Sequence, residues 1–310
     1  MKNKLSSIFK KSVISFSLSA ILINSGLSYA ETFIKEEYLQ KLKRDVITID
    51  KVKNLEIKNN DEIEELILLG DFYLYNEKYR NTFKSFDYYK RATIKGSEYA
   101  KMMLGYFTYK GYGTDPNVYK GEFLLRDVKR PYDKNAKFLL ALSFYNDKQY
   151  DKSIDLFLNI KDTLSYKYLT TMLIEKDRTS EAIPYLEWLS YTENDRVGKR
   201  ILGELYLTRE HLNEDEAIKL LTSSAEDGDD IAQYNLGMYY SRGTENTIAD
   251  MKEATRWFLM SSQHDNAFAI KELINIWSIN QTKNNIYGLN NDPYLIKELD
   301  DIFVKMHLND

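Results

Sequence analysis

Apolar and small residues between residues 97 and 113 recur with the period of an α-helix. Four of them stand at i, i+4, i+5 and i+8 and so share one helical face: Ala100, Leu104, Gly105 and Thr108. Gly111 and Gly113 follow, and glycine readily takes the left-handed backbone that ends a helix. The stretch is therefore predicted to be one amphipathic helix that begins near Ser97 and ends near Gly111.

The same pattern returns along the chain, with a small residue at position one, leucine at five, a small residue at six and an aromatic at nine. The better copies contain Leu69, Gly70 and Tyr73; Ala136, Leu140, Ala141 and Phe144; Gly198, Leu202, Gly203 and Tyr206; and Ala232, Leu236, Gly237 and Tyr240. A degenerate copy surrounds Tyr168 and Met172, and a weak one contains Ala269 and Leu273. Copies 30 to 37 residues apart, with two helical patterns per period, are typical of an α-solenoid. We therefore expect an all-α, right-handed solenoid of helix pairs over residues 65–279.

The second helix of each pair has a constant spacing of its own. Small residues mark the points where it would cross its neighbour, and they are Ser85, Gly121, Ala217 and Ala254. Asn213 followed by Glu216, and Thr247 followed by Asp250, resemble capping boxes that start such helices. Pro184 lies within another of these helices, and it would have to occupy the first turn to avoid a kink.

The two ends of the chain lack the repeat pattern. Residues 1–30 combine four lysines and no acid with an apolar stretch from Val13 to Leu27 and the small residues Ser28 and Ala30. That order is typical of a secretory signal peptide cleaved after Ala30, and the alternative is a buried or membrane-anchoring helix. Residues 31–64 are expected to form N-terminal capping helices, and residues 280–310 a polar loop and an amphipathic closing helix.

The amino-acid composition limits where the protein can be located and which classes of partner it would bind. The net charge of −4 becomes −8 without the four lysines of the signal region, and an acidic protein without a basic run is a poor candidate for nucleic acid. After the signal, no stretch reaches the ~18 apolar residues that a membrane span needs. The chain has no cysteine, which excludes a lipid-carrying cysteine and disulfides. We expect an exported protein, located in the periplasm or secreted, that is stabilised by packing.

The repeat pattern, an alanine-containing helix followed by A…LG..Y..G, resembles the Sel-one-like repeat, a relative of the tetratricopeptide repeat. The best copies run from Ala92 to Gly113 and from Ser224 to Gly243, and the resemblance covers residues 65–277. The chain departs from the family pattern at Thr108, where an aromatic is usual, and at Ala141, where glycine is usual. The resemblance implies a scaffold or adaptor. Bacterial members of this kind are often exported and take part in envelope assembly, contact host proteins or neutralise delivered toxins.

No residues in the sequence have the spacing of a catalytic or metal site. The three histidines, His211, His264 and His307, stand far apart, and the stretch from Asp227 to Asp230 lacks the later ligands of an EF-hand. Phosphate-loop and nucleophile-elbow motifs are missing as well. We therefore expect neither a metal nor another cofactor. The alternative is an enzyme or carbohydrate-processing protein with a site assembled across repeats from Tyr, Asp and Glu.

Aromatic residues supply the candidates for a binding surface, since the chain has 25 Tyr and 14 Phe. In two-helix repeats the first helices line the concave face, and positions three, seven and ten point away from the Leu-Gly stripe. Eight candidate partner-binding residues occupy these positions: Met102, Tyr106, Tyr109, Phe138, Leu142, Tyr145, Tyr234 and Met238. Tyr combines a large contact area with a hydroxyl and suits binding surfaces. The alternative is that these residues pack between neighbouring repeats.

These features predict an exported module that binds a protein or peptide partner. It would act as a scaffold, as an adaptor or as an immunity protein against a delivered toxin. The net negative charge of the mature chain would favour a basic partner, but only modestly.

Overall fold

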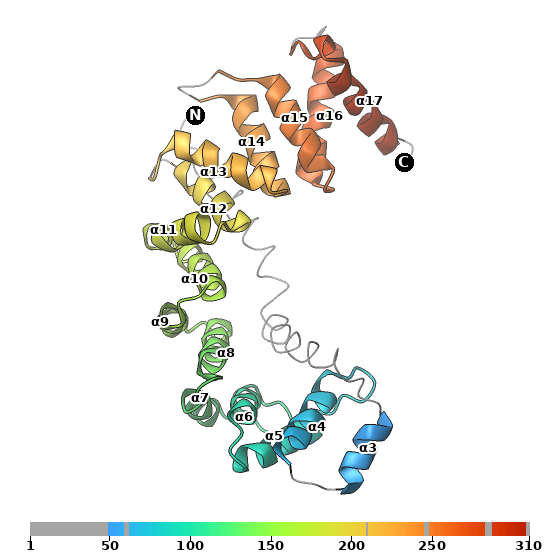
Figure 1. The fold of residues 1–310 in the computed structure, drawn as a ribbon. Coiled ribbons are helices and arrows are strands. Elements are labelled where there is room, and N and C mark those ends of the chain that lie inside the picture. Colours follow the sequence, from blue (N-terminus) through green and yellow to red (C-terminus); the bar gives the residue numbers. More distant parts are fainter. Residues whose placement is uncertain (1–48, 59–61, 209, 245–247, 283–286, 308–310) are drawn as a thin grey trace. The chain divides into compact units, whose positions relative to one another are not determined.

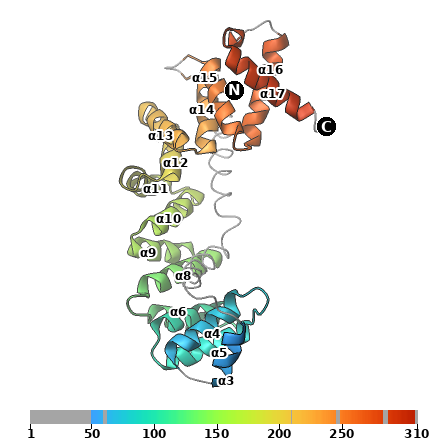
Figure 2. The same cartoon turned by 45° about the vertical axis from the view of Figure 1, so that its right-hand side comes forward.

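The computed structural model describes residues 49–58, 62–208, 210–244, 248–282 and 287–307. The predicted signal peptide, residues 1–30, and the first part of the expected N-terminal capping segment lie outside these ranges. The described residues form helices and connecting turns without a strand, so the all-α prediction is confirmed (Figures 1 and 2). They form two compact bodies, residues 49–172 and residues 173–307, and the boundary lies within α10.

The N-terminal body is a run of helix pairs that follows a single leading helix. Its elements are α3 (Ile49–Lys58), α4 (Ile63–Tyr75), α5 (Thr82–Ile94), α6 (Glu98–Lys110), α7 (Val118–Arg126), α8 (Asp133–Asn146), α9 (Tyr150–Ile160) and α10 (Thr163–Glu175), the last of which extends past the boundary. The helices of each pair pack on each other, α4 on α5, α6 on α7 and α8 on α9. The degenerate copy around Tyr168 is therefore still helical.

The C-terminal body continues the pairs and ends in a closing helix (Figure 1). Its elements are α11 (Thr179–Glu187), the π-helix η1 (Trp188–Thr192), α12 (Arg196–Tyr206), α13 (Glu214–Glu226), α14 (Asp230–Arg242), α15 (Met251–Ser262), α16 (Ala267–Thr282), the short 3-10 helix η2 (Leu289–Asn291) and α17 (Pro293–His307). Consecutive helices pack side by side from α12 to α16.

One hydrogen bond closes the turn inside four of the helix pairs. The residue that caps the second helix donates its backbone N–H, over 2.7–2.8 Å, to the carbonyl at position nine of the first helix. The donor and acceptor pairs are Asn81 to Tyr73, Asn117 to Thr108, Asn213 to Tyr206 and Asp250 to Tyr240. The same side chains cap their helices by accepting a backbone N–H three residues on. The residue at position nine and the capping residue thus hold the turn between the two helices of each of these pairs.

Position six brings the two helices of a pair into close contact. A side-chain carbon at Gly237 would lie 2.5 Å from Phe258 Cδ1, and one at Gly203 would lie 2.9 Å from Leu221 Cγ. The residues at positions one and five are buried as expected in most copies, as with Ala232 and Leu236. The predicted packing stripe of the first helix is therefore confirmed. Thr108 fits at position nine because its hydroxyl donates to the Leu104 carbonyl at 2.7 Å.

Three local expectations need correction. Pro184 is the sixth residue of α11 and not in its first turn, and the chain widens into a π-helix directly after α11. The helix α15 is capped by Asp250, which accepts N–H groups from Lys252 and Glu253, while Thr247 lies outside the described residues. The loop expected from Asn280 begins later, because α16 continues to Thr282 and Asn280 is buried, with its Nδ2 donating to Asn290 Oδ1 at 2.9 Å.

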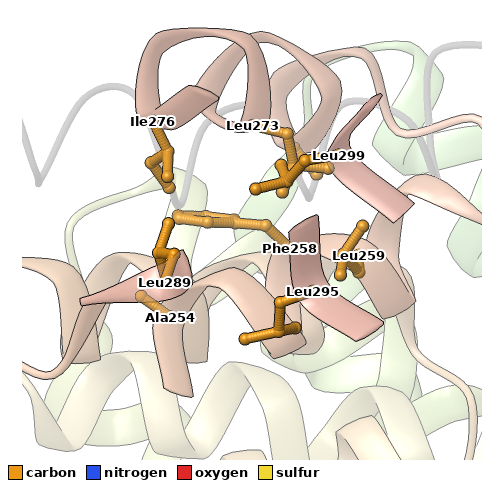
Figure 3. Close-up of a cluster of buried hydrophobic side chains, with 9 residues drawn as sticks. Ala254, Phe258, Leu259, Leu273, Ile276, Leu289, Leu295 and Leu299 are labelled. Atoms are coloured by element: carbon orange, nitrogen blue, oxygen red, sulfur yellow. The ribbon is translucent and has the colours of Figure 1, made fainter. Parts of the chain in front are cut away.

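The core of the C-terminal body collects side chains from α15, α16, η2 and α17. Phe258 lies among Leu273, Ile276 and Leu289, and Leu295 and Leu299 of α17 join the same cluster (Figure 3). Burial of this apolar surface is what attaches the closing helix. Val304, farther along α17, is exposed.

Candidate protein-interaction surface

Five of the eight candidate partner-binding residues are buried. Met102, Tyr106 and Tyr109 lie on α6, and Phe138 and Leu142 lie on α8; each of these five side chains is only 1–4% exposed. The expectation that these five line an accessible groove is therefore wrong for this structure. The other three, Tyr145 of α8 and Tyr234 and Met238 of α14, are partly exposed.

Contacts between neighbouring repeats account for this burial. The ring of Tyr109 lies 6.4 Å from that of Phe144 in the next first helix, and its hydroxyl donates to Asp147 Oδ2 at 2.5 Å. The ring of Phe138 lies 5.6 Å from that of Tyr168 on α10. Burial, followed by the nearby Asp147 carboxylate, raises the pKa of Tyr109. The alternative left open by the sequence, packing between repeats, describes these residues.

The three partly exposed candidates belong to different bodies, Tyr145 to the N-terminal body and Tyr234 and Met238 to the C-terminal body. Tyr145 packs edge-to-face on Tyr150, with ring centroids 5.8 Å apart. Tyr234 lies 5.7 Å from Phe258 and 6.0 Å from Phe268, and Met238 packs against the same C-terminal core. Burial raises the pKa of Tyr234, so its hydroxyl stays protonated and can donate a hydrogen bond at neutral pH. Their role in binding stays a prediction.

Position seven of the first repeat carries a buried carboxylate. Asp71 of α4 accepts hydrogen bonds from the hydroxyls of Tyr89 at 2.6 Å and Tyr99 at 2.9 Å. These tyrosines belong to α5 and α6, so Asp71 links three helices. Burial and the charge of Asp71 raise the pKa of Tyr89 well above its usual value. Tyr89 thus remains a donor to Asp71, and the group acts as a structural connection between repeats.

Positions three and seven of the α12 repeat hold an ionic network in place of apolar side chains. Arg200 is only 1% exposed. Its Nη1 donates to Glu204 Oε1 at 3.0 Å, and its Nε lies 3.2 Å from Asp229 Oδ1. Asn235 of α14 donates to the same Glu204 oxygen at 2.8 Å. Burial raises the pKa of Glu204, an effect that Arg200 only partly offsets. Arg200 pairs with two carboxyl groups and so ties α12 to the start of α14.

Among the described residues, no three His, Cys, Asp or Glu side chains lie where they could hold a metal ion. His211 contacts the Thr179 hydroxyl through Nε2 at 3.4 Å. The buried charges of this chain therefore connect helices, and contact with a partner depends on what the helices expose.

The most exposed aromatic side chains lie on second helices, which the sequence-based choice of residues passed over. Phe83 of α5 and Tyr119 and Phe123 of α7 are 72%, 88% and 69% exposed. A signal for them is present in the sequence. Phe83 and Tyr119 each stand two residues before the small crossing residues Ser85 and Gly121, on the side of the helix that faces away from the crossing.

Comparison with known proteins identifies the repeat. Residues 66–97, 98–126, 200–229 and 230–266 match the model of the Sel1 repeat, and each range corresponds to one helix pair. The chain contains Sel1 repeats. They are the Sel-one-like repeats expected from the sequence, and their helix pairs form the solenoid described above. Sel1-repeat proteins generally mediate protein–protein interactions.

The curated proteins to which this chain is similar include a much longer one. It is the ERAD-associated E3 ubiquitin-protein ligase component HRD3B of Arabidopsis thaliana, 27% identical over 123 residues. This match covers 40% of the chain but 18% of that protein, so the chain spans less than a fifth of its length. What HRD3B assembles with is a property of that larger protein.

Two solved structures are similar in fold. The first is c5321, a protective antigen of uropathogenic Escherichia coli strains with an SLR fold. It matches with a TM-score of 0.52 and 21% identity over 80% of this chain and 56% of its own. The second is a Sel1 repeat protein of Oxalobacter formigenes, with a TM-score of 0.46, 17% identity, and coverage of 76% and 98%. At these identities the likeness concerns the fold alone.

No helix in the described ranges is long and apolar enough to cross a membrane.

Proposed function

We propose that this chain is an exported scaffold or adaptor whose Sel1 repeats bind a polypeptide partner. The proposal rests on the difference between the residues that recur in successive repeats and the residues that vary among them. The cap and the small residue at position six recur from pair to pair, whereas residues outside the packing stripe change their chemistry. Such a division gives a fixed backbone with a variable surface, which is what an interaction scaffold requires.

Export is part of the same proposal. It is supported by the order of lysines, apolar residues and small residues in residues 1–30. The exported protein should then begin at Glu31. N-terminal sequencing of protein recovered from the periplasm or the medium tests this, and an intact Met1 on that protein would contradict it.

Partner binding is tested by affinity capture from a periplasmic extract with the mature chain as bait. We expect a discrete protein to be retained, and we expect Tyr145→Ala, or Tyr234→Ala together with Met238→Ala, to weaken its retention. Tyr109→Ala serves as the control, because it should lower the melting temperature first. If no protein is retained above the level of an unrelated bait, the scaffold proposal fails.

Neutralisation of a delivered toxin is a narrower form of this proposal. It predicts that the captured partner is toxic when expressed alone in the periplasm and harmless when the mature chain is expressed with it. A partner that is harmless when expressed alone would contradict the immunity role but would be compatible with the scaffold function.

A further inference from the structure

Three exposed aromatic side chains lie on the second helices of two consecutive repeats. We call Phe83, Tyr119 and Phe123 the aromatic ridge. Phe83 and Tyr119 are each the second residue of their helix and follow the capping asparagines Asn81 and Asn117. Of the six aromatic side chains in the described ranges that are more than half exposed, three belong to this ridge. None of the three makes a ring contact within the described part of the chain.

The ridge stands on a rigid support. A side-chain carbon at Gly121 of α7 would lie 2.5 Å from the backbone nitrogen of Tyr109, so α7 rests directly on α6. One at Gly113 would collide with the backbone of Thr82 and Phe83, so the turn before α7 rests on the start of α5. The start of α5 and the helix α7 are thereby both in contact with the segment that contains α6 and the turn after it. A surface fixed in this way loses little conformational entropy on binding.

Helix stability does not explain the residues that follow these asparagine caps. The first turn of a helix favours acidic side chains, because the helix dipole is positive there. The first turn of α13 fits this rule with Glu214, Asp215 and Glu216. At the same positions α7 has Val118, Tyr119 and Lys120, and α5 likewise has an aromatic followed by a lysine.

The surroundings of the ridge are positively charged within an acidic protein. Residues 82–131 contain ten Lys and Arg against five Asp and Glu, whereas the whole chain has 43 against 47. Lys90 of α5 and Lys120 of α7 are exposed, and neither makes an ion pair within the described residues. Exposed lysines without an ion pair, on the same helices as exposed apolar side chains, attract an acidic partner and speed its association.

Carboxylates on the same helices favour a polypeptide over a lipid surface. Asp87 stands one helical turn after Phe83, and Glu122 is adjacent to Phe123 and pairs with Arg126 at 2.8 Å. An anionic bilayer would repel both carboxylates. Across a protein interface they can accept N–H groups, and a mixture of aromatic and charged residues is usual there.

We propose that the aromatic ridge, with Lys90 and Lys120, is a docking surface for an acidic polypeptide that has apolar side chains. The rings supply the buried contact area, and the lysines pair with the carboxylates of the partner. This inference rests on the proposed scaffold function and adds the place and the chemistry of one interface.

The test uses the mature chain and labelled synthetic peptides of about 20 residues, long enough to form a helix in water. The probe is an amphipathic peptide of Glu and Leu, and the comparison peptides are its Lys and Leu counterpart and a poly-Glu of equal length. Fluorescence anisotropy should show the Glu-Leu peptide binding at least roughly tenfold more tightly than either. Equal binding of all three peptides would overturn the proposal.

Variants then locate the binding. Tyr119→Ser with Phe123→Ser, and separately Lys90→Glu with Lys120→Glu, should each raise the Kd for the Glu-Leu peptide at least roughly tenfold. All four side chains are exposed, so thermal melts should change little.

Matched controls lie in the C-terminal body. Tyr191→Ser with Tyr294→Ser removes two aromatics that are also more than half exposed. Lys271→Glu with Lys297→Glu makes the same change in net charge as the double lysine variant of the ridge. Both controls should bind the Glu-Leu peptide as the parent does. Controls that weaken binding as much as the ridge variants would show that the ridge is not the site.

Two other occupants would be revealed by the same variants. Ridge-dependent binding to vesicles that contain phosphatidylglycerol, without binding to the Glu-Leu peptide, would make the ridge a lipid surface and refute the proposal. Ridge-dependent self-association in sedimentation velocity would make a second copy the occupant and refute it equally. If ridge variants still retain a captured partner that the Tyr145 or Tyr234 variants lose, this inference fails and the scaffold function stands.

Discussion

A substitution at Gly237 tests the close contact between the two helices of a pair. The position is on α14, and an added Cβ would lie 2.5 Å from both Cδ1 and Cε1 of Phe258 on α15. Real Cβ atoms essentially never approach that closely, so Gly237→Ala must displace the ring. Phe258 is 1% exposed and surrounded by the leucines of the C-terminal core, so the ring cannot swing into solvent (Figure 3).

Two effects of opposite sign decide the outcome. Replacing glycine by alanine inside a helix gains about 1 kcal/mol from helix propensity. Overpacking of a filled core costs about 1–3 kcal/mol, and a ring without room to move places this site at the upper end. We therefore expect Gly237→Ala to lower the free energy of unfolding by about 2 kcal/mol, and Gly237→Leu to lower it further.

Urea denaturation followed by tryptophan fluorescence is the appropriate assay. All three tryptophans, Trp188, Trp257 and Trp277, lie in the C-terminal body, so fluorescence reports on the body that contains the substitution. Far-UV circular dichroism on the same samples follows the helices of both bodies.

A double-mutant cycle separates overpacking from other causes. Phe258→Leu provides space, so the double variant with Gly237→Ala should be more stable than the two single effects predict, by about 1 kcal/mol or more. If Gly237→Ala instead stabilises the protein by about 1 kcal/mol, helix propensity alone is at work. The contact between α14 and α15 would then be looser than described.

Three further variants test the buried side chains. Tyr109→Ala should cost about 3–5 kcal/mol of stability in thermal or urea melts, and a cost below 1 kcal/mol would place the ring at the surface. Arg200→Met should cost about 3–5 kcal/mol, because it leaves the buried Glu204 without its cation; a stable variant would show that the network is dispensable. The pKa of Glu98 is lowered mainly by the backbone N–H of Lys129, so its contribution is present above pH ~4.5 and is lost as the pH falls through its lowered pKa. Glu98→Gln should therefore reduce the dependence of the melting temperature on pH between ~5 and ~3, and an unchanged dependence would contradict the assignment.

The repeat frame could be predicted because each of its positions has a chemical requirement. A small residue is needed at position six because the partner helix touches the backbone there, as Phe258 does at Gly237. The predicted cap Asn213 likewise accepts a hydrogen bond from the backbone N–H of Glu216. These constraints act within one helix pair, so a local pattern in the sequence reveals them.

The accessible face could not be predicted from the period of a single helix. Positions three, seven and ten lie outside the Leu-Gly stripe of the first helix. However, the first helix has another neighbour on that side, the first helix of the next repeat, and α6 packs on α8 in this way. Tyr109 is buried by this second contact. The spacing of a helix shows that a residue lies opposite the packing stripe, and it does not show whether solvent or another repeat covers it.

Buried polar groups were also missed, since their partners come from distant segments. Asp71 is paired with tyrosines 18 and 28 residues away, and Asn235 reaches Glu204 across 31 residues. In the sequence these residues appear as ordinary surface positions.

The hydrogen bond that closes each hairpin has a consequence for how such a chain could change in length. Donor and acceptor belong to the same helix pair, and the bond survives connecting turns of six, seven, seven and eight residues. A tandem duplication of one pair would therefore bring its own turn closure and cap with it. The junction would require only that the new pair stack on its neighbours. Gain or loss of whole pairs by recombination is thus less disruptive for this architecture than insertion of a few residues inside a helix.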